Sequence, residues 1–338
     1  MGIRKIAEMT GLSTATVSHV LNGTRKVSKA SRDKVFSAAD SIGYRPNIAA
    51  RMLRTKKSRT IALIIPSDES NTNANYFYMD VIMGVRKKAL ETRYEVVVST
   101  YDPHSDQEAS LRSAQVLRQR WIDGVIIVPT SLNEAQLGTI RELELPFVLL
   151  DRRSDVHFPC VASDNLTGVV EALGLFARCG KRRIGFIGGS GTATGRQRHA
   201  GYLEGMRRLG FAVDAGMVLL SGHYSLQNGM TCAQALIDAK ADAIFAADNV
   251  MMMGALRAIR ANGLRIPEDV GLIGFDDFDW MENVSPPLTT IKQQTFRMGY
   301  AAAEMLIRKI GGSEENETVL LDTVLVVRGS HGAGGDAP

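Results

Sequence analysis

The 338-residue sequence predicts a small all-α headpiece followed by a two-lobed α/β body. The first 59 residues contain 13 lysine and arginine residues against three acidic ones, a net charge of +10, whereas the remainder carries −6. Helical periodicity occupies residues 3–42, and from residue 60 continuous apolar segments alternate with amphipathic ones. This length suits a small domain joined to a larger one of about 270 residues.

Two short helices are predicted within residues 3–21, separated by Gly11. Ala7 is small enough for two helices to cross closely, Gly11 can adopt a left-handed turn, and Val17 can fill the space between the helices. A third helix over about residues 29–42 would complete a miniature core. This spacing is typical of a helix-turn-helix, and with the basic charge it predicts DNA binding. The alternative is an unrelated three-helix fragment with a polar surface.

The second helix is predicted to begin at Thr14, after Ser13 as its cap, and to lie in the major groove of DNA. Side chains near the start of such a helix contact base edges. The candidate DNA-binding residues of this helix are Thr14, Ala15, Thr16, Ser18, His19 and Asn22.

Several segments of this region resemble the headpiece of the lactose-repressor (LacI/GalR) family. They are Ile6-Ala-x-x-x-Gly-Leu-Ser13, Thr16-Val-Ser18, Val20-Leu-Asn22, Val27-Ser28 and Gly43-Tyr-x-Pro-Asn47. The resemblance implies a hinge helix over residues 46–54 that orders only on DNA, with Leu53 as a wedge in the minor groove. Asn47, Arg51 and Arg54 are then predicted to contact DNA beside it. For Leu53, ordinary packing between domains is the alternative.

Two positions depart from the family pattern. Gly2 stands where a threonine usually caps the first helix, so this cap is expected to be weak. His19 occupies a position that is often arginine, and it offers fewer donors to a guanine edge. The operator sequence therefore cannot be transferred from a relative.

The body shows apolar strands separated by helices, which indicates parallel sheets covered on both faces. Strands are predicted at 61–65, 95–99, 124–128, 147–150, 183–187, 243–246 and 270–274. Helices are predicted at 78–92, 106–119, 166–179, 198–209, 230–239 and 251–262.

The resemblance extends over the body as far as Ser330. Its segments are Asn75-Tyr-Phe77, Val148-Leu-Leu-Asp-Arg152, Asp164-Asn165, Arg183-Ile-Gly-Phe-Ile-Gly188, Arg198-x-x-Gly-Tyr202, Ala247-Asp248, Gly274-Phe-Asp-Asp277, Pro287-Leu-Thr-Thr-Ile291 and Leu325-Val-Val-Arg-x-Ser330. They imply a periplasmic-binding-protein-like type I effector domain, with two lobes joined by crossovers near residues 160, 290 and 320.

The expected organisation follows from this resemblance. A headpiece (1–45), a hinge and linker (46–59) and an effector-binding and dimerisation domain (60–330) precede a disordered tail (331–338). Within the effector domain, the N-lobe comprises about 60–160 plus 291–320, and the C-lobe about 161–290 plus 321–330.

Ligands in such folds bind at the carboxyl ends of the strands. Asp151, Asp164, Asp248 and Asp276 follow or end predicted strands, and Arg198 begins a helix after a glycine-rich loop. Carboxylates and an arginine can form charge-assisted bonds to vicinal hydroxyls. The aromatic rings that could cover the apolar face of a sugar are Phe77, Tyr224 and Trp280.

Alternatives remain open at several of these positions. Asp164 could cap a helix, Asp277 could be an interlobe ion-pair partner, and Phe77 could belong to the core. Arg152 is a candidate effector ligand, and with Arg153 and Arg196 it raises the possibility of a sugar acid or sugar phosphate. The aspartates favour a neutral monosaccharide, and a purine is possible in this family.

The sequence gives little support for an enzyme or for a metal site. Gly189-x-Gly191 lacks the third glycine of a dinucleotide fingerprint at Thr194, and Ser190 is not in a nucleophile elbow. Six histidines and three cysteines form no metal cluster, and no cofactor is expected. Without a signal peptide or an apolar run long enough for a membrane span, a cytoplasmic location is expected, which disfavours a transport receptor without a DNA role.

These observations predict a sequence-specific transcription regulator. The resemblance favours a repressor of carbohydrate-utilisation genes, controlled allosterically by a small sugar-like effector. A homodimer is expected, because paired heads would bind a pseudo-palindromic operator. The stub after Ser330 is too short for a tetramerising coiled coil.

Overall fold

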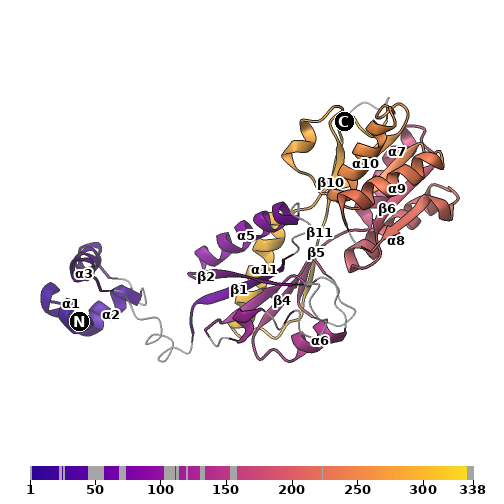
Figure 1. The fold of residues 1–338 in the computed structure, drawn as a ribbon. Coiled ribbons are helices and arrows are strands. Elements are labelled where there is room, and N and C mark those ends of the chain that lie inside the picture. Colours follow the sequence, from indigo (N-terminus) through magenta and orange to yellow (C-terminus); the bar gives the residue numbers. More distant parts are fainter. Residues whose placement is uncertain are drawn as a thin grey trace. The chain divides into compact units, whose positions relative to one another are not determined.

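The computed structural model describes residues 2–22, 25, 27–44, 57–67, 74–102, 111, 114–118, 121–129, 134–152, 158–222 and 224–332. The chain divides into two compact units, Met1–Ser58 and Arg59–Pro338 (Figure 1). Each unit has its own hydrophobic core, so each is described by itself.

The described residues of the first unit form three helices: α1 (Ile3–Thr10), α2 (Thr14–Asn22) and α3 (Lys29–Ser41). Gly11 ends α1 with a left-handed φ of 70°, as expected for the turn of a helix-turn-helix. Ile6, Val17 and Val35 are completely buried where the helices meet. The Ser13 hydroxyl accepts the Thr16 N–H at 3.1 Å, which confirms the predicted cap of α2. Gly2 caps α1 without a side-chain hydrogen bond, as its lack of a side chain requires.

The first lobe of the second unit is a six-stranded parallel sheet in the order β11-β5-β4-β3-β1-β2. Its strands are β1 (Thr60–Pro66), β2 (Glu95–Tyr101), β3 (Gly124–Ile127), β4 (Phe147–Leu150), β5 (Cys160–Ser163) and β11 (Thr318–Leu321). Its helices are α5 (Ala74–Glu91), α6 (Glu134–Arg141) and α11 (Thr295–Ile310), with the 3-10 turn η2 (Gln115–Arg118). The central strand β3 is buried throughout, as a sheet covered on both faces requires.

Helices α5 and α11 pack closely against each other beside this sheet (Figure 1). A side-chain carbon added at Gly84 would lie 2.0 Å from the Phe296 carbonyl oxygen, and one at Gly299 would lie 2.1 Å from the Val81 oxygen. Only glycine permits so close an approach of two backbones.

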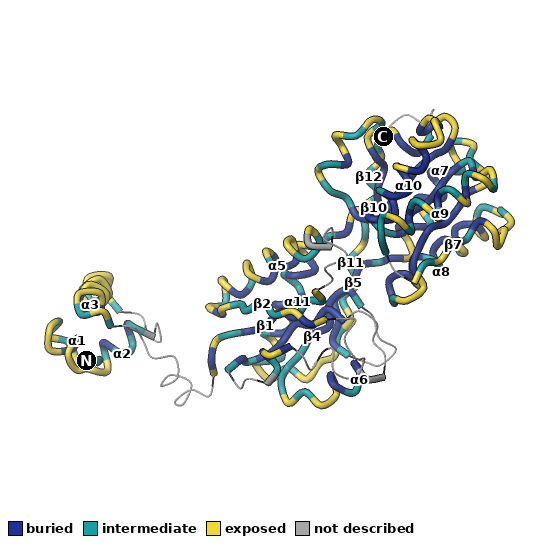
Figure 2. Tube along the Cα trace, viewed as in Figure 1, coloured by how far each residue is buried: buried dark blue, intermediate teal, exposed yellow. Residues whose placement is uncertain are grey.

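The second lobe has a sheet in the order β12-β10-β9-β8-β6-β7, in which only the β10–β12 pair is antiparallel among the described strands. Its strands are β6 (Ile184–Gly189), β7 (Val218–Ser221), β8 (Ala243–Ala246), β9 (Gly271–Phe275), β10 (Thr289–Lys292) and β12 (Val324–Val326). Its helices are α7 (Thr167–Arg178), α8 (Ala193–Arg208), α9 (Leu226–Asp238) and α10 (Asn249–Ala261), with 3-10 turns η3 (Ala215–Met217) and η4 (Asp279–Glu282). Figure 2 shows that the inner strands of both sheets are buried and that the helices around them are partly exposed.

In the described residues the chain passes between the two sheets three times, at 164–166, 293–294 and 322–323. The lobe boundaries differ slightly from the expectation, because β5 belongs to the first sheet and β10 to the second. The first lobe therefore extends to Ser163.

Every strand predicted in the body is present, but five strands lack a counterpart in the prediction: β5, β7, β10, β11 and β12. Helices α6 and α11 were also not predicted. The predicted helix at 106–119 lies mostly outside the described residues, and its segment Gln115–Arg118 is a 3-10 turn instead of an α-helix.

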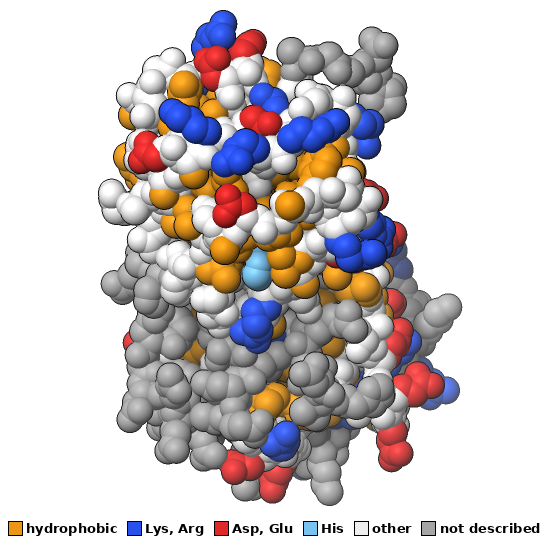
Figure 3. Space-filling view, turned by 90° about the vertical axis from the view of Figure 1, so that its right-hand side faces the viewer, with side chains coloured by type: hydrophobic (Ala, Val, Ile, Leu, Met, Phe, Trp, Pro, Cys, Tyr) orange, Lys and Arg blue, Asp and Glu red, His pale blue; other side chains and the backbone are white. Residues whose placement is uncertain are grey.

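The surface of the C-terminal lobe carries charges of both signs. Lys and Arg side chains gather on the upper part of the face in Figure 3, with acidic side chains among them. Several neutralise each other along one helix or turn, as Glu204 does with Arg207 and Arg208, and Asp269 with Arg265. None of the helices within the described ranges is both long and apolar enough to cross a membrane.

Candidate functional site

Two aspartates adopt a left-handed backbone conformation directly after parallel strands. Asp151 follows β4 with a φ of 67°, and Asp276 follows β9 with a φ of 70°. Both side chains are buried. Residues other than glycine rarely adopt this conformation, and where they do the strain often marks a functional site. The two lobes thus each contribute a buried carboxylate at the carboxyl edge of their sheet.

Asp151 forms an ion pair with the neighbouring Arg152, and both side chains are largely buried. Burial raises the pKa of Asp151, and Asp276 adds to the rise, while Arg152 and Arg198 oppose it. These influences require Asp276 and Arg198 of the second lobe to lie within electrostatic range of Asp151 in the first. The carboxylates and arginines therefore lie near one another where the two lobes meet, and this junction is the candidate effector cleft.

Arg198, on α8, is fixed from three directions and is buried. Its Nε donates to the Asn165 Oδ1 at 2.9 Å, and its Nη1 donates to the Ala247 carbonyl at 2.7 Å. Its guanidinium carbon lies 3.6 Å from the centre of the Phe275 ring, a cation–π contact. The guanidinium is held in place before any ligand arrives.

Asp276 is held by two buried amides. The Asn249 Nδ2 donates to its Oδ2 at 3.2 Å, and the Gln293 Nε2 donates to its Oδ1 at 2.6 Å. Neither Asn249 nor Gln293 was among the predicted site residues. Gln293 lies two residues beyond Ile291, the last residue of a quoted family segment, so the sequence held a weak signal for it.

Asp248 caps α10, with its Oδ1 accepting the N–H groups of Val250 at 2.8 Å and Met251 at 3.3 Å. Burial and the nearby Asp276 raise the pKa of Asp248 to about 6, although Arg198 and the two N–H groups lower it. A carboxylate pKa near 6 is typical of sites where charge serves a function.

Three buried side-chain atoms have no partner at hydrogen-bond distance and angle in the part of the chain that the structure describes: the Asp151 Oδ1, the Tyr224 hydroxyl and the Gln293 Oε1. Burial raises the pKa of Tyr224, and the Thr192 side chain lies close enough to oppose this rise, so the Tyr224 hydroxyl has a polar neighbour nearby. Arg198 influences the pKa of both Asp151 and Tyr224, and Gln293 bonds Asp276. All three atoms therefore belong to the same cleft. Buried polar atoms in folded proteins are nearly always paired, so these are candidate ligand contacts.

The remaining predicted effector residues lie in other surroundings. The Asp164 Oδ1 accepts the N–H groups of Leu166 and Thr167 at 3.1 and 3.0 Å, so its carboxylate caps the start of α7. Phe77 is half-buried against the core of the first lobe, and Trp280 packs on the core of the second. These positions match the alternatives of helix cap and core residue.

Asp277 is paired within the second lobe. Its Oδ1 lies 2.6 Å from the Arg328 Nη1 and accepts the Thr290 hydroxyl at 2.6 Å. The interlobe ion pair considered for Asp277 is therefore not formed with this arginine. Arg153 lies outside the described residues, and Arg196 donates to the Ser190 carbonyl at 3.4 Å on the surface.

The predicted DNA-contacting side chains of α2 differ in exposure. Thr14 and Ala15 are exposed, and Ser18 and His19 are partly exposed. The Thr16 hydroxyl lies 2.9 Å from the Ser13 hydroxyl, so it takes part in the helix cap. The side chain of Asn22, and Asn47, Arg51, Leu53 and Arg54, lie outside the described residues.

A pocket of about 360 Å³ lies at the amino ends of β4 and β5. Its lining includes the edge-to-face pair Phe147 and Phe158 and the cationic side chains Arg141 and Lys309. Asp151 follows the opposite end of β4, so this pocket is separate from the cleft. In the described ranges, no group of three or more His, Cys, Asp and Glu side chains could hold a metal ion.

Comparison with known proteins agrees with this architecture. Residues 2–47 match the family described as bacterial regulatory proteins, lacI family, and residues 173–331 match the periplasmic binding protein-like domain. The chain is 32% identical over 335 residues to the HTH-type transcriptional regulator CelR of Thermobifida fusca, covering 97% of each chain.

Solved structures resemble it over nearly the full length. The structure of a transcriptional regulator CelR–cellobiose complex superposes with a TM-score of 0.75 at 30% identity, covering 98% of this chain and 99% of the other. The lac repressor dimer bound to operator and an anti-inducer has a TM-score of 0.84 at 24% identity, with the same coverage, and shares the fold. The chain therefore belongs to the LacI family of bacterial DNA-binding transcription regulators.

Proposed function

We propose that this regulator binds a pseudo-palindromic operator as a homodimer and that a neutral sugar in the interlobe cleft controls its affinity for this operator. Repression of carbohydrate-utilisation genes is the function that this arrangement supports best. The protein acts by binding and not by catalysis. The cellobiose complex of the related regulator supports a sugar as the class of effector.

The observation that carries the effector class is the set of three unpaired atoms in the cleft. The Asp151 and Gln293 oxygens can only accept hydrogen bonds while Asp151 is ionised, and the Tyr224 hydroxyl can donate or accept. A ligand that satisfies them must supply several donors at once. The hydroxyl groups of a sugar do so, and each can also accept from a neighbouring group.

The charges of the cleft favour a neutral ligand over an anion. Arg152 is paired with Asp151, and Arg198 already donates to Asn165 and to a main-chain carbonyl. Asp276 and Asp248 add two more carboxylates to the same region. A sugar acid or sugar phosphate would bring its charge close to three carboxylates and two arginines with existing partners.

Effector binding would favour the lobe arrangement in which these atoms are buried. A buried polar atom without a partner costs about 1–3 kcal/mol. A sugar that pairs the atoms removes this cost, whereas in an arrangement with separated lobes water pairs them instead. The sugar therefore has a different affinity for the two arrangements, which is the condition for an allosteric effect.

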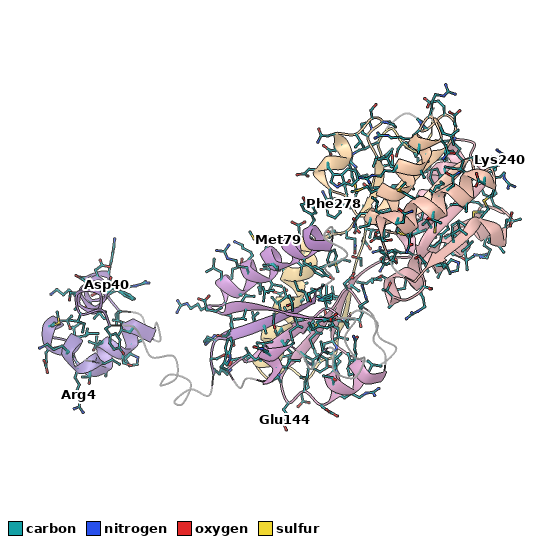
Figure 4. The ribbon with its side chains drawn as sticks, in the orientation of Figure 1. Arg4, Asp40, Met79, Glu144, Lys240 and Phe278 are labelled. Atoms are coloured by element: carbon teal, nitrogen blue, oxygen red, sulfur yellow. The ribbon has the colours of Figure 1, made fainter. Side chains whose placement is uncertain are left out.

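An apolar stripe on α5 is the candidate dimer face. Tyr76, Met79, Met83 and Leu90 recur at helical spacing, and all four are exposed, from 47% to 70%. The Tyr76 ring lies 5.4 Å from that of Phe278 in the second lobe. Met79 and Phe278 are seen on these neighbouring parts of the two lobes in Figure 4. Burial of such a stripe against its copy would stabilise a homodimer.

On DNA, the exposed start of α2 would contact base edges in the major groove. Thr14, Ala15, Ser18 and His19 are the described candidates, and the predicted hinge wedge Leu53 would enter the minor groove. The net charge of +10 in residues 1–59 supports binding to phosphates.

A thermal-shift screen tests the effector class. The panel holds cellobiose and other neutral sugars, sugar acids, sugar phosphates and purines. A ligand at 100 times its dissociation constant should stabilise the protein by about 2.7 kcal/mol. Stabilisation by neutral sugars alone supports the proposal, and stabilisation by acids or phosphates alone contradicts it.

Fluorescence anisotropy tests the DNA role. Duplexes selected from a randomised pool by the protein should bind more tightly than random duplex, with an affinity that falls steeply with salt. Equal affinity for selected and random duplexes would contradict the proposal, because the protein would then bind a ligand but have no specific DNA role. Addition of the stabilising sugar should change the affinity for the selected duplex.

A further inference from the structure

We infer that Asn165 and Gln293 couple the effector cleft to the hinge between the lobes, an inference that rests on the proposed sugar-binding function. The two residues lie on two of the three crossovers, at 164–166 and 293–294. Both side chains are buried, with 2% and 6% exposure. Each amide is bonded to a charged side chain of the cleft.

Asn165 joins the first crossover to Arg198. Its Oδ1 accepts from the Arg198 Nε at 2.9 Å, and its Nδ2 donates to the Ser163 carbonyl at 3.3 Å and to the Gln197 Oε1 at 3.0 Å. Ser163 is the last residue of β5 in the first lobe, whereas Gln197 and Arg198 lie on α8 in the second. A single buried amide therefore bridges both lobes at the crossover.

Gln293 joins the second crossover to Asp276. Its Nε2 donates to the Asp276 Oδ1 at 2.6 Å, while its Oε1 is buried without a hydrogen bond. A sugar hydroxyl bound to Asp276 would compete with the Gln293 donor, and one bound to the free Oε1 would hold the amide in place. Because Gln293 lies on the crossover, either contact would change the conformation that the crossover backbone prefers.

Hydrogen bonds also join the crossovers to one another. The Thr323 hydroxyl donates to the Asp164 carbonyl at 3.4 Å, and the Gln294 Nε2 donates to the Asp322 carbonyl at 2.7 Å. The third crossover, 322–323, is thereby tied to the other two. A change at Asn165 or Gln293 is expected to alter all three together, which is what a rotation of the lobes requires.

The matched pair of variants is Gln293→Met and Asn249→Leu in the full-length protein. Each removes one buried amide donor to the same Asp276 carboxylate, but Asn249 lies on α10 and not on a crossover. A general effect on the cleft would appear in both variants, whereas an effect on the hinge would appear only in Gln293→Met. Asn165→Leu provides the same test at the other crossover.

The first measurement needs no effector. Cys179 and Cys232 are first replaced by serine so that they do not react with the dyes. The exposed Glu144 in the first lobe and Ala261 in the second are then changed to cysteine (Glu144→Cys and Ala261→Cys) and labelled with a donor and an acceptor dye. Single-molecule energy transfer is recorded with labelled protomers diluted in unlabelled protein. We expect Gln293→Met and Asn165→Leu to shift or broaden the distance distribution between the lobes, and Asn249→Leu to leave it as in the parent. Equal distributions in all four proteins, or the same change in all three variants, would overturn the inference.

The second measurement uses the selected duplex and the sugars of the panel, cellobiose included, at saturation. Effectors typically change affinity by roughly 5- to 150-fold. This factor should fall to about 1–2 in Gln293→Met and stay near the parental value in Asn249→Leu, with both variants binding the sugar more weakly. A parental factor in Gln293→Met would contradict the inference. If no sugar binds the parent, the proposed effector class fails, and the distance measurement still decides the role of the hinge.

Discussion

Replacement of Asp248 by asparagine should stabilise the protein at alkaline pH. The pKa of Asp248 is raised from 3.8 to about 6, above all by burial and then by Asp276. A difference of about 2 pKa units corresponds to at most about 3 kcal/mol. Burial is the main cause of the rise, but the residue keeps some contact with solvent, and screening by solvent reduces the figure to about 1–2 kcal/mol.

The sign follows from the linkage between protonation and folding. With a folded pKa above the unfolded one, Asp248 destabilises the folded state at pH values above about 6, and this penalty disappears as the pH falls from 6 to below 3.8. Asparagine caps a helix as well as aspartate does, so the bonds to the start of α10 can be retained. Asp248→Asn should therefore raise the free energy of unfolding by about 1–2 kcal/mol at pH 8, with little difference at pH 4.

Urea unfolding at pH 8, 6.5, 5 and 4 measures this difference. In thermal melts at pH 8 it should appear as a rise of roughly 1–4 °C. Asp164→Asn is the matched control, since Asp164 also caps a helix but through solvent-exposed hydrogen bonds, and it should shift stability by less than about 0.5 kcal/mol at every pH. A variant at Asp248 that is less stable than the parent at pH 8 would refute the reasoning.

Three further substitutions separate the parts of the mechanism. Arg198→Ala should keep operator binding in anisotropy but lose the response to the sugar. A normal response would show that the effector does not bind at Arg198. Leu53→Ala should weaken operator affinity while thermal melts show an intact body, and an unchanged affinity would exclude the wedge. Arg328→Met should lower the free energy of urea unfolding by about 3–5 kcal/mol, because it leaves the buried Asp277 carboxylate without its arginine, and a loss below about 1 kcal/mol would contradict this.

The sequence predicted those elements of the fold whose signals are local. The turn at Gly11, the cap at Ser13 and the apolar strands of the two sheets each depend on a few adjacent residues. Strand β7 was not predicted because it lies at a sheet edge and is only partly buried. Strand β11 alternates between exposed and partly buried residues for the same reason, and it pairs with β5 more than 150 residues away. Such edge strands depend on partners that local periodicity does not reveal.

The candidate cleft was predicted in part. The rule that ligands bind at the carboxyl ends of strands located Asp151, Asp248 and Asp276 correctly at those ends, although their roles stay predictions. The same rule also selected Asp164, whose hydrogen bonds are those of a helix cap. It did not find Asn249, because an amide at the start of a helix looks like any other polar residue until its partner is known.

Several features of the cleft lower the stability of the protein in the same small region. Asp151 and Asp276 have strained backbones, three buried polar atoms lack hydrogen bonds, and Asp248 has a raised pKa. Poor packing does not explain this, because buried polar groups elsewhere in the described ranges are paired, as the Tyr202 hydroxyl is with the Ile184 carbonyl at 2.8 Å. Features that destabilise the protein without ligand are expected at a binding site, because the residues there are placed to contact the ligand. A sugar that pairs these atoms would recover that free energy on binding, so the features that destabilise the empty cleft are the ones that give the effector its differential affinity.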